Sequence, residues 1–371
     1  MTIRLLALFI GVSILICRCT NRAEKEGGKL PEISLSKPQE IQMESLIIRD
    51  FIPLETTSLN LMSTDLRIRF DDSNFYVFDE SIRDGINKFG RDGSFKGSLA
   101  TVGEGPNQIL ALNDFYINSN GQLEVLSTVG DQSKIIKITD NEPEVLFNIN
   151  YIASSFSKLS NGDFLLYGSY NLPLTKYRMV HVNNNGEIVN SFLENKYKNK
   201  MLPMTERNFF ESGNDLFIVE VFNQRIYRFV ENLEGFIDFN FEEFSLPSNF
   251  WERDIMESFP DLVEKKFASF MGVFSDKDLM LINIDIQGEY ENKRKLILID
   301  SVKENNYIFT SDLNINNLFH NPVGVENKKI YFYTYQSAIK SLKENYLSID
   351  LINKIPDKEF DYPVIIVVEF L

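Results

Sequence analysis

A pattern of short strands separated by tight turns recurs along the chain, and this repetition restricts the fold more than any other feature. Its clearest copy spans residues 72–107, where an Asp92-Gly93 turn joins two alternating apolar runs ahead of a glycine-rich corner. Asp-Gly is a strong hairpin signal because both turn positions tolerate positive φ angles. Turn residues of similar copies recur at intervals of roughly 40–65 residues, and repeats of roughly this length built from four short strands are typical of a β-propeller. These turn residues are Asn74, Gly121, Gly162, Asn214, Asp278 and Lys328.

The last copy lacks one strand, and the N-terminal region has one to spare. Strands are expected near 321–325, 329–334 and 363–370, and the chain ends at Leu371. A spare strand at 44–54 can take the missing outer place, which avoids an open ring with unpaired strand edges. We therefore predict an all-β fold over residues 41–371. It is a six-bladed β-propeller of four-stranded antiparallel blades, closed by an N-terminal strand.

Two segments favour helices over strands. Residues 248–270 carry apolar side chains at helical spacing, although Pro260 must break the helix or start a turn. This segment predicts a short helical insertion between blades four and five. A second candidate helix covers residues 337–346.

The N-terminus has the form of an export signal. Arg4 precedes an apolar run from Leu5 to Cys17 that is too short to span a bilayer comfortably. We assign residues 1–17 to a signal peptide, of lipoprotein type in preference to simple secretion, and residues 18–40 to a flexible tether. The only cysteines are Cys17 and Cys19, so we predict lipidation at Cys17, with Cys19 as the alternative.

Composition excludes some classes of function. A formal net charge of −15 argues against a nucleic-acid partner. The two histidines, His181 and His320, fall in different blades, which excludes a histidine-rich metal site, and we expect both to be packed or surface residues.

We predict no cofactor and no metal site, while a calcium-like ion held by carboxylates in the central channel stays open. Residues 103–106 lack the helix and lysine of a phosphate-binding loop, so we interpret them as a tight crossing between blades.

Several stretches resemble a known family. FIPLETT at 51–57, YVFD and INKFGRDG in the first blade, VGEGPNQI at 102–109 and the terminal YPVIIVVEFL are similar to the six-bladed β-propeller lipoproteins of Gram-negative envelopes, which are NHL-repeat-like. Gly103, Gly105 and Pro106 match the family corner, whereas Asn107 and Gln108 stand where glycine and glutamate are usual. The resemblance implies the fold and an envelope location, anchored in the outer membrane, and no established activity.

In a propeller, the loops between the second and third strands of each blade lie on the same face as the blade-to-blade crossings. The predicted insertions fall on this face too, and long loops on a rigid scaffold commonly carry binding. We therefore expect a protein that binds a glycan, a peptide or an envelope protein through this face. The candidate contacts are Arg83, Tyr170, Arg207, Trp251, Arg253 and Tyr335.

Two other functions are compatible with the sequence. One is a hydrolase or lyase with carboxylates or a metal ion in the central channel, and the other is a structural subunit of an outer-membrane assembly. An enzyme would need several inward carboxylates, which one sequence cannot place, and fold alone does not choose among these functions.

Overall fold

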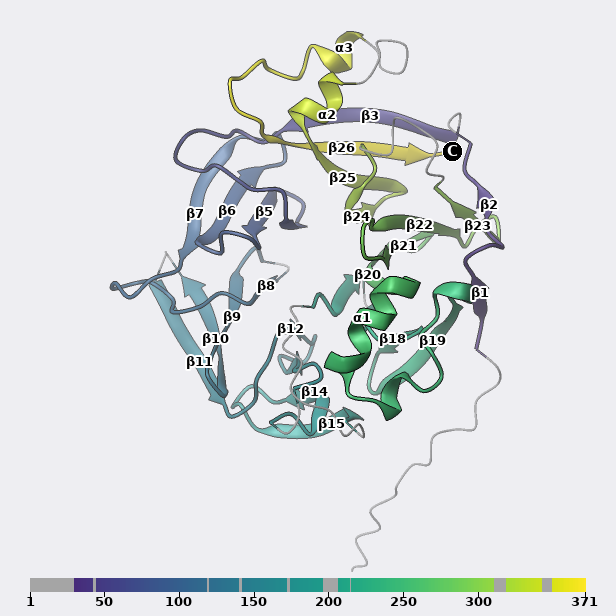
Figure 1. The fold of residues 1–371 in the computed structure, drawn as a ribbon. Coiled ribbons are helices and arrows are strands. Elements are labelled where there is room, and N and C mark those ends of the chain that lie inside the picture. The colour runs from purple at the N-terminus through teal and green to yellow at the C-terminus, as the bar shows by residue number, and fades with distance from the viewer. Residues whose placement is uncertain are drawn as a thin grey trace, which may run out of the picture.

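The fold is a ring of six β-sheets around a central axis (Figure 1), as the repeats predict. A computed structural model describes residues 30–42, 45–118, 120–139, 142–171, 174–195, 206–213, 215–309, 318–341 and 349–371. Each blade is a four-stranded antiparallel sheet whose first strand lies innermost, and blades four and five each gain a fifth strand.

The strands follow one another around the ring. From the inner strand outward, blades one to three comprise β4 (Leu66–Phe70), β5 (Asn74–Asp79), β6 (Gly85–Gly90) and β7 (Phe95–Thr101); β8 (Asp114–Ile117), β9 (Leu123–Val129), β10 (Gln132–Thr139) and β11 (Glu142–Ile149); and β12 (Ser155–Lys158), β13 (Phe164–Tyr167), β14 (Tyr177–Val182) and β15 (Ile188–Glu194). Blades four to six comprise β16 (Phe209–Ser212), β17 (Asp215–Ile218), β18 (Arg225–Phe229) and β19 (Leu233–Asn240); β20 (Phe267–Ser275), β21 (Leu279–Gln287), β22 (Lys293–Asp300) and β23 (Asn305–Ile308); and β24 (Asn321–Glu326), β25 (Lys329–Tyr335), β26 (Pro363–Phe370) and β3 (Leu46–Pro53).

Blade six is completed by the N-terminal strand, which confirms the predicted closure. Strand β3 pairs antiparallel with β26, with Pro53 opposite Val364 and Leu46 opposite Phe370. Phe51 of β3 is only 2% exposed and belongs to the apolar core between blades five and six. The end of β3 also meets the Asp92-Gly93 turn of blade one. The backbone of Gly93 has a φ of 85° and lies so close to Pro53 that a Cβ there would sit 2.1 Å from the Pro53 carbonyl oxygen.

The last part of the predicted tether lies along the ring. Residues 18–29 of the predicted 18–40 tether lie outside the described residues, but β1 (Glu32–Ser34) pairs parallel with β19, and β2 (Gln39–Glu40) pairs parallel with β23. We call the segment from β1 to Ile41 the strap. Apolar side chains hold it in place, because Ile33, Leu35 and Ile41 are buried against blades four to six. The strap therefore covers the outer edges of two blades before the chain enters blade six (Figure 1).

The helices lie where the sequence predicts them but are shorter than the predicted segments. The insertion between blades four and five contains η2 (Glu242–Phe244), η3 (Phe250–Glu252) and α1 (Ile255–Lys265), with Pro260 inside α1. After blade six's second strand come α2 (Gln336–Lys340), where a helix was predicted at 337–346, and α3 (Ile349–Ile352). Among the described residues, no helix is long and apolar enough to cross a membrane. Cys17 and Cys19 lie outside the described residues.

The corner after blade one is a tight crossing, as interpreted from its glycines. Val102 and Ile109 form a parallel bridge, and the Gly103 amide donates to the Ile109 carbonyl at 2.9 Å. The Gln108 side chain accepts a hydrogen bond from the Gly105 amide at 2.7 Å. A Cβ on Gly103 would meet the end of the same Gln108 side chain at 2.2 Å, so a larger residue there would have to displace Gln108.

Candidate functional site

Two adjoining cavities lie along the propeller axis. We call the side that carries the blade-to-blade crossings and the loops between second and third strands the loop face. The mouth cavity, of about 330 Å³, is lined at this face by residues such as Asp65, Glu80 and Arg207. The channel cavity, of about 290 Å³, continues along the inner strands toward the opposite face and reaches Glu326. Both volumes are near the lower end of those of small-molecule sites, which run from about 300 to 1,000 Å³.

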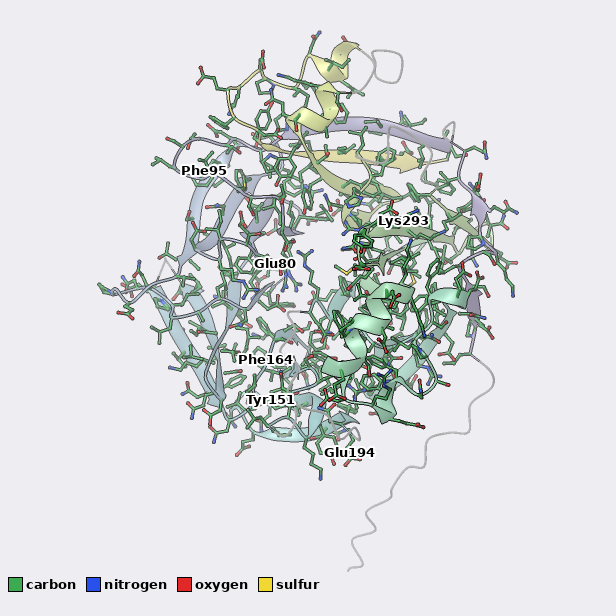
Figure 2. The ribbon with its side chains drawn as sticks, in the orientation of Figure 1. Glu80, Phe95, Tyr151, Phe164, Glu194 and Lys293 are labelled. Carbon is green, nitrogen blue, oxygen red and sulfur yellow. The ribbon has the colours of Figure 1, made fainter. Side chains whose placement is uncertain are left out.

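A buried arginine joins blades one and two beside the axis. Arg67 of β4 is 5% exposed, and its guanidinium group donates to Glu80 in the β5–β6 loop and to Asp114 at the start of β8. Asp114 also accepts the backbone amides of Phe115 at 2.8 Å and Phe156, in blade three, at 3.0 Å. These charge-assisted bonds compensate for removing the arginine and both carboxylates from water. Figure 2 shows Glu80 at the inner edge of blade one, facing the axis.

Blades one and four lie opposite each other and are connected across the axis. Arg207, at the start of blade four, donates through Nε to Glu80 at 2.9 Å and through Nη2 to the same oxygen, and it reaches Asp65 at 3.3 Å. Desolvation by burial would raise the pKa of Glu80, but the Arg67 and Arg207 guanidinium groups lower it to about 2. Glu80 is therefore ionised at neutral pH and shared by two arginines from opposite sides of the ring.

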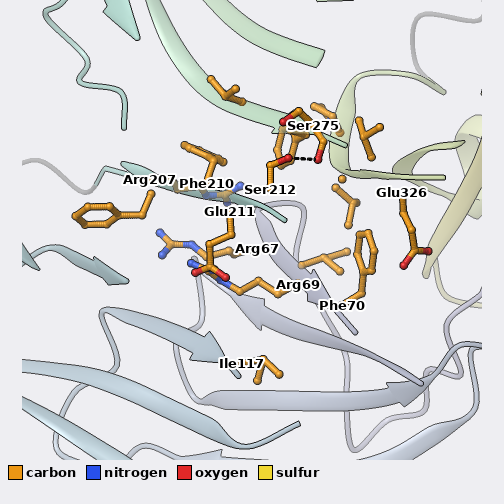
Figure 3. Close-up of a pocket in the computed structure, with 18 of the residues that line it drawn as sticks. Arg67, Arg69, Phe70, Ile117, Arg207, Phe210, Glu211, Ser212, Ser275 and Glu326 are labelled. Atoms are coloured by element: carbon orange, nitrogen blue, oxygen red, sulfur yellow. Dashed lines mark hydrogen bonds and ion pairs between the residues drawn. The ribbon is translucent and has the colours of Figure 1, made fainter. Parts of the chain in front are cut away.

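A second, looser connection crosses the axis deeper in the channel (Figure 3). Arg69 of β4 lies 3.6 Å from Asp114 and 4.0 Å from Glu211 of β16 in blade four. Glu211 also accepts the Ser157 hydroxyl at 2.8 Å. Desolvation in the channel raises the pKa of Glu211, and Arg69 opposes that rise.

The opposite wall of the mouth cavity comes from blades five and six. Asn283 of β21 is 6% exposed, and its side-chain oxygen has no partner among the described residues. Arg294 of β22 donates through Nη1 to the His320 carbonyl and to Asn321, both at 2.8 Å, while its Nε has no partner there. A buried acceptor and a buried donor are thus left unsatisfied on one wall of a cavity, an arrangement that a ligand or an ordered water commonly satisfies.

A buried glutamate forms the blade-four wall of the mouth cavity. Glu206 is 3% exposed and accepts the Ser169 hydroxyl at 2.5 Å, the Asn208 amide at 3.0 Å and the Val221 backbone amide at 3.3 Å. Desolvation by burial raises the pKa of Glu206 to about 7; these hydrogen bonds lower it only partly, and the nearby Glu220 carboxylate raises it further. Glu220 is itself held by Arg178, whose Nε donates at 2.5 Å.

Two of the six predicted contacts line the mouth cavity. These are Arg207 and Arg83. Arg83 has a φ of 57°, and its Nε donates to the Glu80 carbonyl at 2.9 Å, so the loop around Glu80 fixes its direction. The structure therefore brings these two arginines together at the loop face.

The other four lie away from both cavities. Tyr170 is 3% exposed and stacks on Trp251 at 5.1 Å between ring centroids, within an apolar cluster that attaches the helical insertion to the ring. Arg253 pairs with Asp261 at 3.0 Å on the surface of the insertion, and the Tyr335 hydroxyl donates to the Ser63 carbonyl. None of the described residues 248–265 lines either cavity, so the insertion lies beside the mouth.

Neither histidine lines the two cavities. His181 pairs with Asp163 at 2.8 Å on blade three, and desolvation together with Arg294 lowers the pKa of His320 to about 4. In the part of the chain that the structure describes, no three His, Cys, Asp or Glu side chains are grouped so as to hold a metal ion.

Sequence reasoning missed the charged residues that line the axis. These residues lie on or next to strands, where apolar side chains that pack in the core are the usual expectation. They are Arg67, Arg69, Glu206, Glu211, Asn283 and Arg294. A signal was present, because charged residues interrupt the first strand of blades one and four in LRIRF and RNFFES. The first strand of a blade is the innermost, and a charge there must face another blade or the channel.

Comparisons with solved structures support the fold. A Bacteroides fragilis protein that carries a provisional description as exported is 17% identical, with a TM-score of 0.74 over 92% of this chain and 99% of that chain. Kuenenia stuttgartiensis hydrazine synthase is 13% identical, with a TM-score of 0.43 over 81% of this chain and 86% of that one. The PQQ-bound aldose sugar dehydrogenase of Streptomyces coelicolor is 9% identical, with a TM-score of 0.42 over 88% and 98%. At TM-scores below 0.5, neither enzyme bears on the activity of this protein.

No protein among the curated ones matches the sequence. The similarity to the Bacteroides fragilis protein shows the propeller and no more, because the identity is low. A family model covers nearly the whole propeller. It is described as "Domain of unknown function (DUF4934)" and matches residues 31–369, and the chain belongs to this family.

Proposed function

We propose that this protein is an exported, lipid-anchored binding protein that takes part of a glycan or peptide into the mouth cavity at its loop face. One observation carries the proposal. The unsatisfied Asn283 oxygen and Arg294 Nε lie on one wall of a cavity whose other wall presents the charged groups of Glu80 and Arg207. Hydroxyl and amide groups of a glycan or peptide both donate and accept hydrogen bonds, so they match this mixed lining.

Location supports the same function. The apolar run ending at Cys17 resembles a lipoprotein signal, and a protein of the same fold carries a description as exported. The strap begins at the outer edge of blade four, away from the axis. A lipid anchor attached upstream of it would leave the mouth cavity accessible.

The test is binding of defined oligosaccharides and short peptides by the full chain, measured by native mass spectrometry and then calorimetry. Asn283→Leu removes the unsatisfied oxygen at similar volume, and Arg294→Gln removes the unsatisfied Nε together with the guanidinium bonds to the His320 carbonyl and Asn321. We expect either variant to weaken binding at least tenfold, about 1.4 kcal/mol. Arg225→Gln is the matched control, because Arg225 pairs with Asp238 on the outer strands of blade four. Ligand affinity that is unchanged in Asn283→Leu and Arg294→Gln would exclude this site.

One observation favours a second candidate, a hydrolase or lyase. Glu206 lines the mouth cavity, and a carboxyl group with a pKa near 7 can act as either a general acid or a general base. Glu206→Gln would then abolish turnover of an oligosaccharide or peptide while leaving its affinity intact. Retention of turnover by that variant would remove Glu206 from any mechanism.

A further inference from the structure

We infer that the channel cavity is a binding site for a small organic acid, whose carboxylate is held by Arg69 and whose apolar body lies against blades five and six. The inference concerns the deeper cavity and goes beyond the proposed function of the mouth. It does not require the mouth cavity to bind a ligand of its own.

The first observation is that the Arg69 guanidinium group is only loosely paired. Its two ion pairs, at 3.6 Å and 4.0 Å, are too long for good hydrogen bonds, and among the described residues its guanidinium group makes none within bonding distance. Its carboxylate neighbours have other donors, since Asp114 takes Arg67 and two backbone amides, and Glu211 takes Ser157. The Arg69 side chain is only 23% exposed. Its N–H groups are therefore available to a planar acceptor that takes two hydrogen bonds at once.

The two sides of the channel cavity differ in polarity. Blades one and four contribute Arg67, Arg69, Arg207 and Glu211, which gather on one side in Figure 3. Blades five and six contribute mainly apolar side chains, Val273, Phe274, Pro322, Val323 and Val325, beside Ser275 and Glu326, with Phe70 of blade one at their edge. A ligand that fills this cavity must therefore present a charged end to one side and apolar surface to the other.

Charge balance selects a carboxylate over a phosphate. Arg67 is consumed by Glu80 and Asp114, and Arg207 by Glu80 and Asp65, which leaves Arg69 as the cation in contact with the cavity that is least engaged among those described. Three arginines beside the cavity face four carboxylates, Asp65, Glu80, Asp114 and Glu211, so a carboxylate monoanion bound at Arg69 meets less repulsion than a phosphate dianion. Burial raises the pKa of Glu211, and Arg69 and the Ser157 hydroxyl oppose that rise. A volume of about 290 Å³ further limits the ligand to a small molecule.

The experiment compares acids with their neutral analogues on the full chain. Benzoate, phenylacetate and hexanoate are titrated by calorimetry against benzamide, phenylacetamide and hexanamide. We expect at least one acid to bind ten times more tightly than its amide. Arg69→Gln should remove that preference and leave the weak amide binding, while Arg69→Lys should keep part of it because the charge remains.

Two controls make the result decisive. Arg225→Gln removes an arginine from an outer-strand pair and should leave acid binding unchanged. Asn283→Leu tests the mouth cavity and should also leave it unchanged, so failure of this inference and failure of the proposed function can be told apart. Circular dichroism verifies the fold of each variant. Equal affinity for acids and amides in the wild-type protein, or acid binding that persists in Arg69→Gln, overturns the inference.

Discussion

The protonation of Glu206 should control how stability depends on pH above the acid range. Its pKa is about 7 in the folded protein because burial disfavours the charge, whereas an unfolded glutamate titrates near pH 4.5. Between these values the folded state binds more protons than the unfolded state, so the free energy of unfolding falls as the pH rises from about 4.5 to 7. The loss from this one group is about 3 kcal/mol.

Glu206→Gln should remove that loss. A glutamine can accept from Asn208 and Val221 through its oxygen and donate to the Ser169 hydroxyl, so the local bonds are kept. We expect the variant to match the wild type in urea unfolding at pH 5 and to exceed it by about 2 kcal/mol at pH 8. Parallel pH profiles for the two proteins would show that Glu206 does not titrate in this range.

Glu80 should behave in the opposite sense. Arg67 and Arg207 lower its pKa to about 2 against the effect of burial, so the folded state binds fewer protons than the unfolded state between about pH 4.5 and 2. Its contribution to stability is complete above about pH 4.5 and is lost as the pH falls toward 2. Acid titration of the Glu80→Gln variant, followed by tryptophan fluorescence and circular dichroism, should show a lower stability at pH 7 and a shallower decline. A decline as steep as that of the wild type would contradict this assignment.

Strands at the N-terminus differ in how they contribute to the ring. Strand β3 forms the outer strand of the closing blade, whereas β1 and β2 add to blades that already have four strands. We expect Phe51→Ala to lower the free energy of global unfolding by about 3–4 kcal/mol, because it leaves a cavity in the core of the closing blade. Ile33→Ala should instead increase local opening, visible as faster amide exchange in β1 and β19 with a nearly unchanged urea midpoint. Equal shifts of the midpoint in both variants would refute the distinction.

The elements that local signals specify could be predicted, and those that depend on distant partners could not. Hairpin turns such as Asp92-Gly93 carry their own signal, and counting strands was enough to assign 44–54 to blade six. Strands β1 and β2 have only three and two residues, and their partners lie about 200 and 270 residues further along the chain, so no local pattern marks them.

The candidate site shows the same limit. Arg207 and Arg83 were predicted because loop positions place them on the loop face. Glu80 and Arg69 were missed because their importance arises from pairing between blades one, two and four, which a single sequence does not reveal. Trp251 was predicted as a contact because its insertion falls on the loop face, and in the structure it is partly buried and stacks on Tyr170. Exposure of a large side chain cannot be inferred from its presence in an insertion.

At the scale of the whole molecule, the ring is held by its axis as well as by its closing blade. Neighbouring blades pack through apolar clusters, but blades one and four are opposite and meet only through charged side chains near the centre among the described residues. Arg207 and Glu80 make the closest of these connections, and Glu80 is 9% exposed, so water screens the pair only partly.

A double-mutant cycle should measure this connection. We expect Arg207→Ala and Glu80→Ala each to reduce the free energy of unfolding by about 2–3 kcal/mol, with a coupling energy of about 1–2 kcal/mol between them. The same cycle on Arg225 and Asp238, an exposed pair within blade four, should give less than about 0.5 kcal/mol. Urea unfolding at pH 7 in low and high salt separates the two, because screening should abolish only the exposed coupling. If the Arg207–Glu80 coupling is equally small, this pair of charges at the axis does not stabilise the ring.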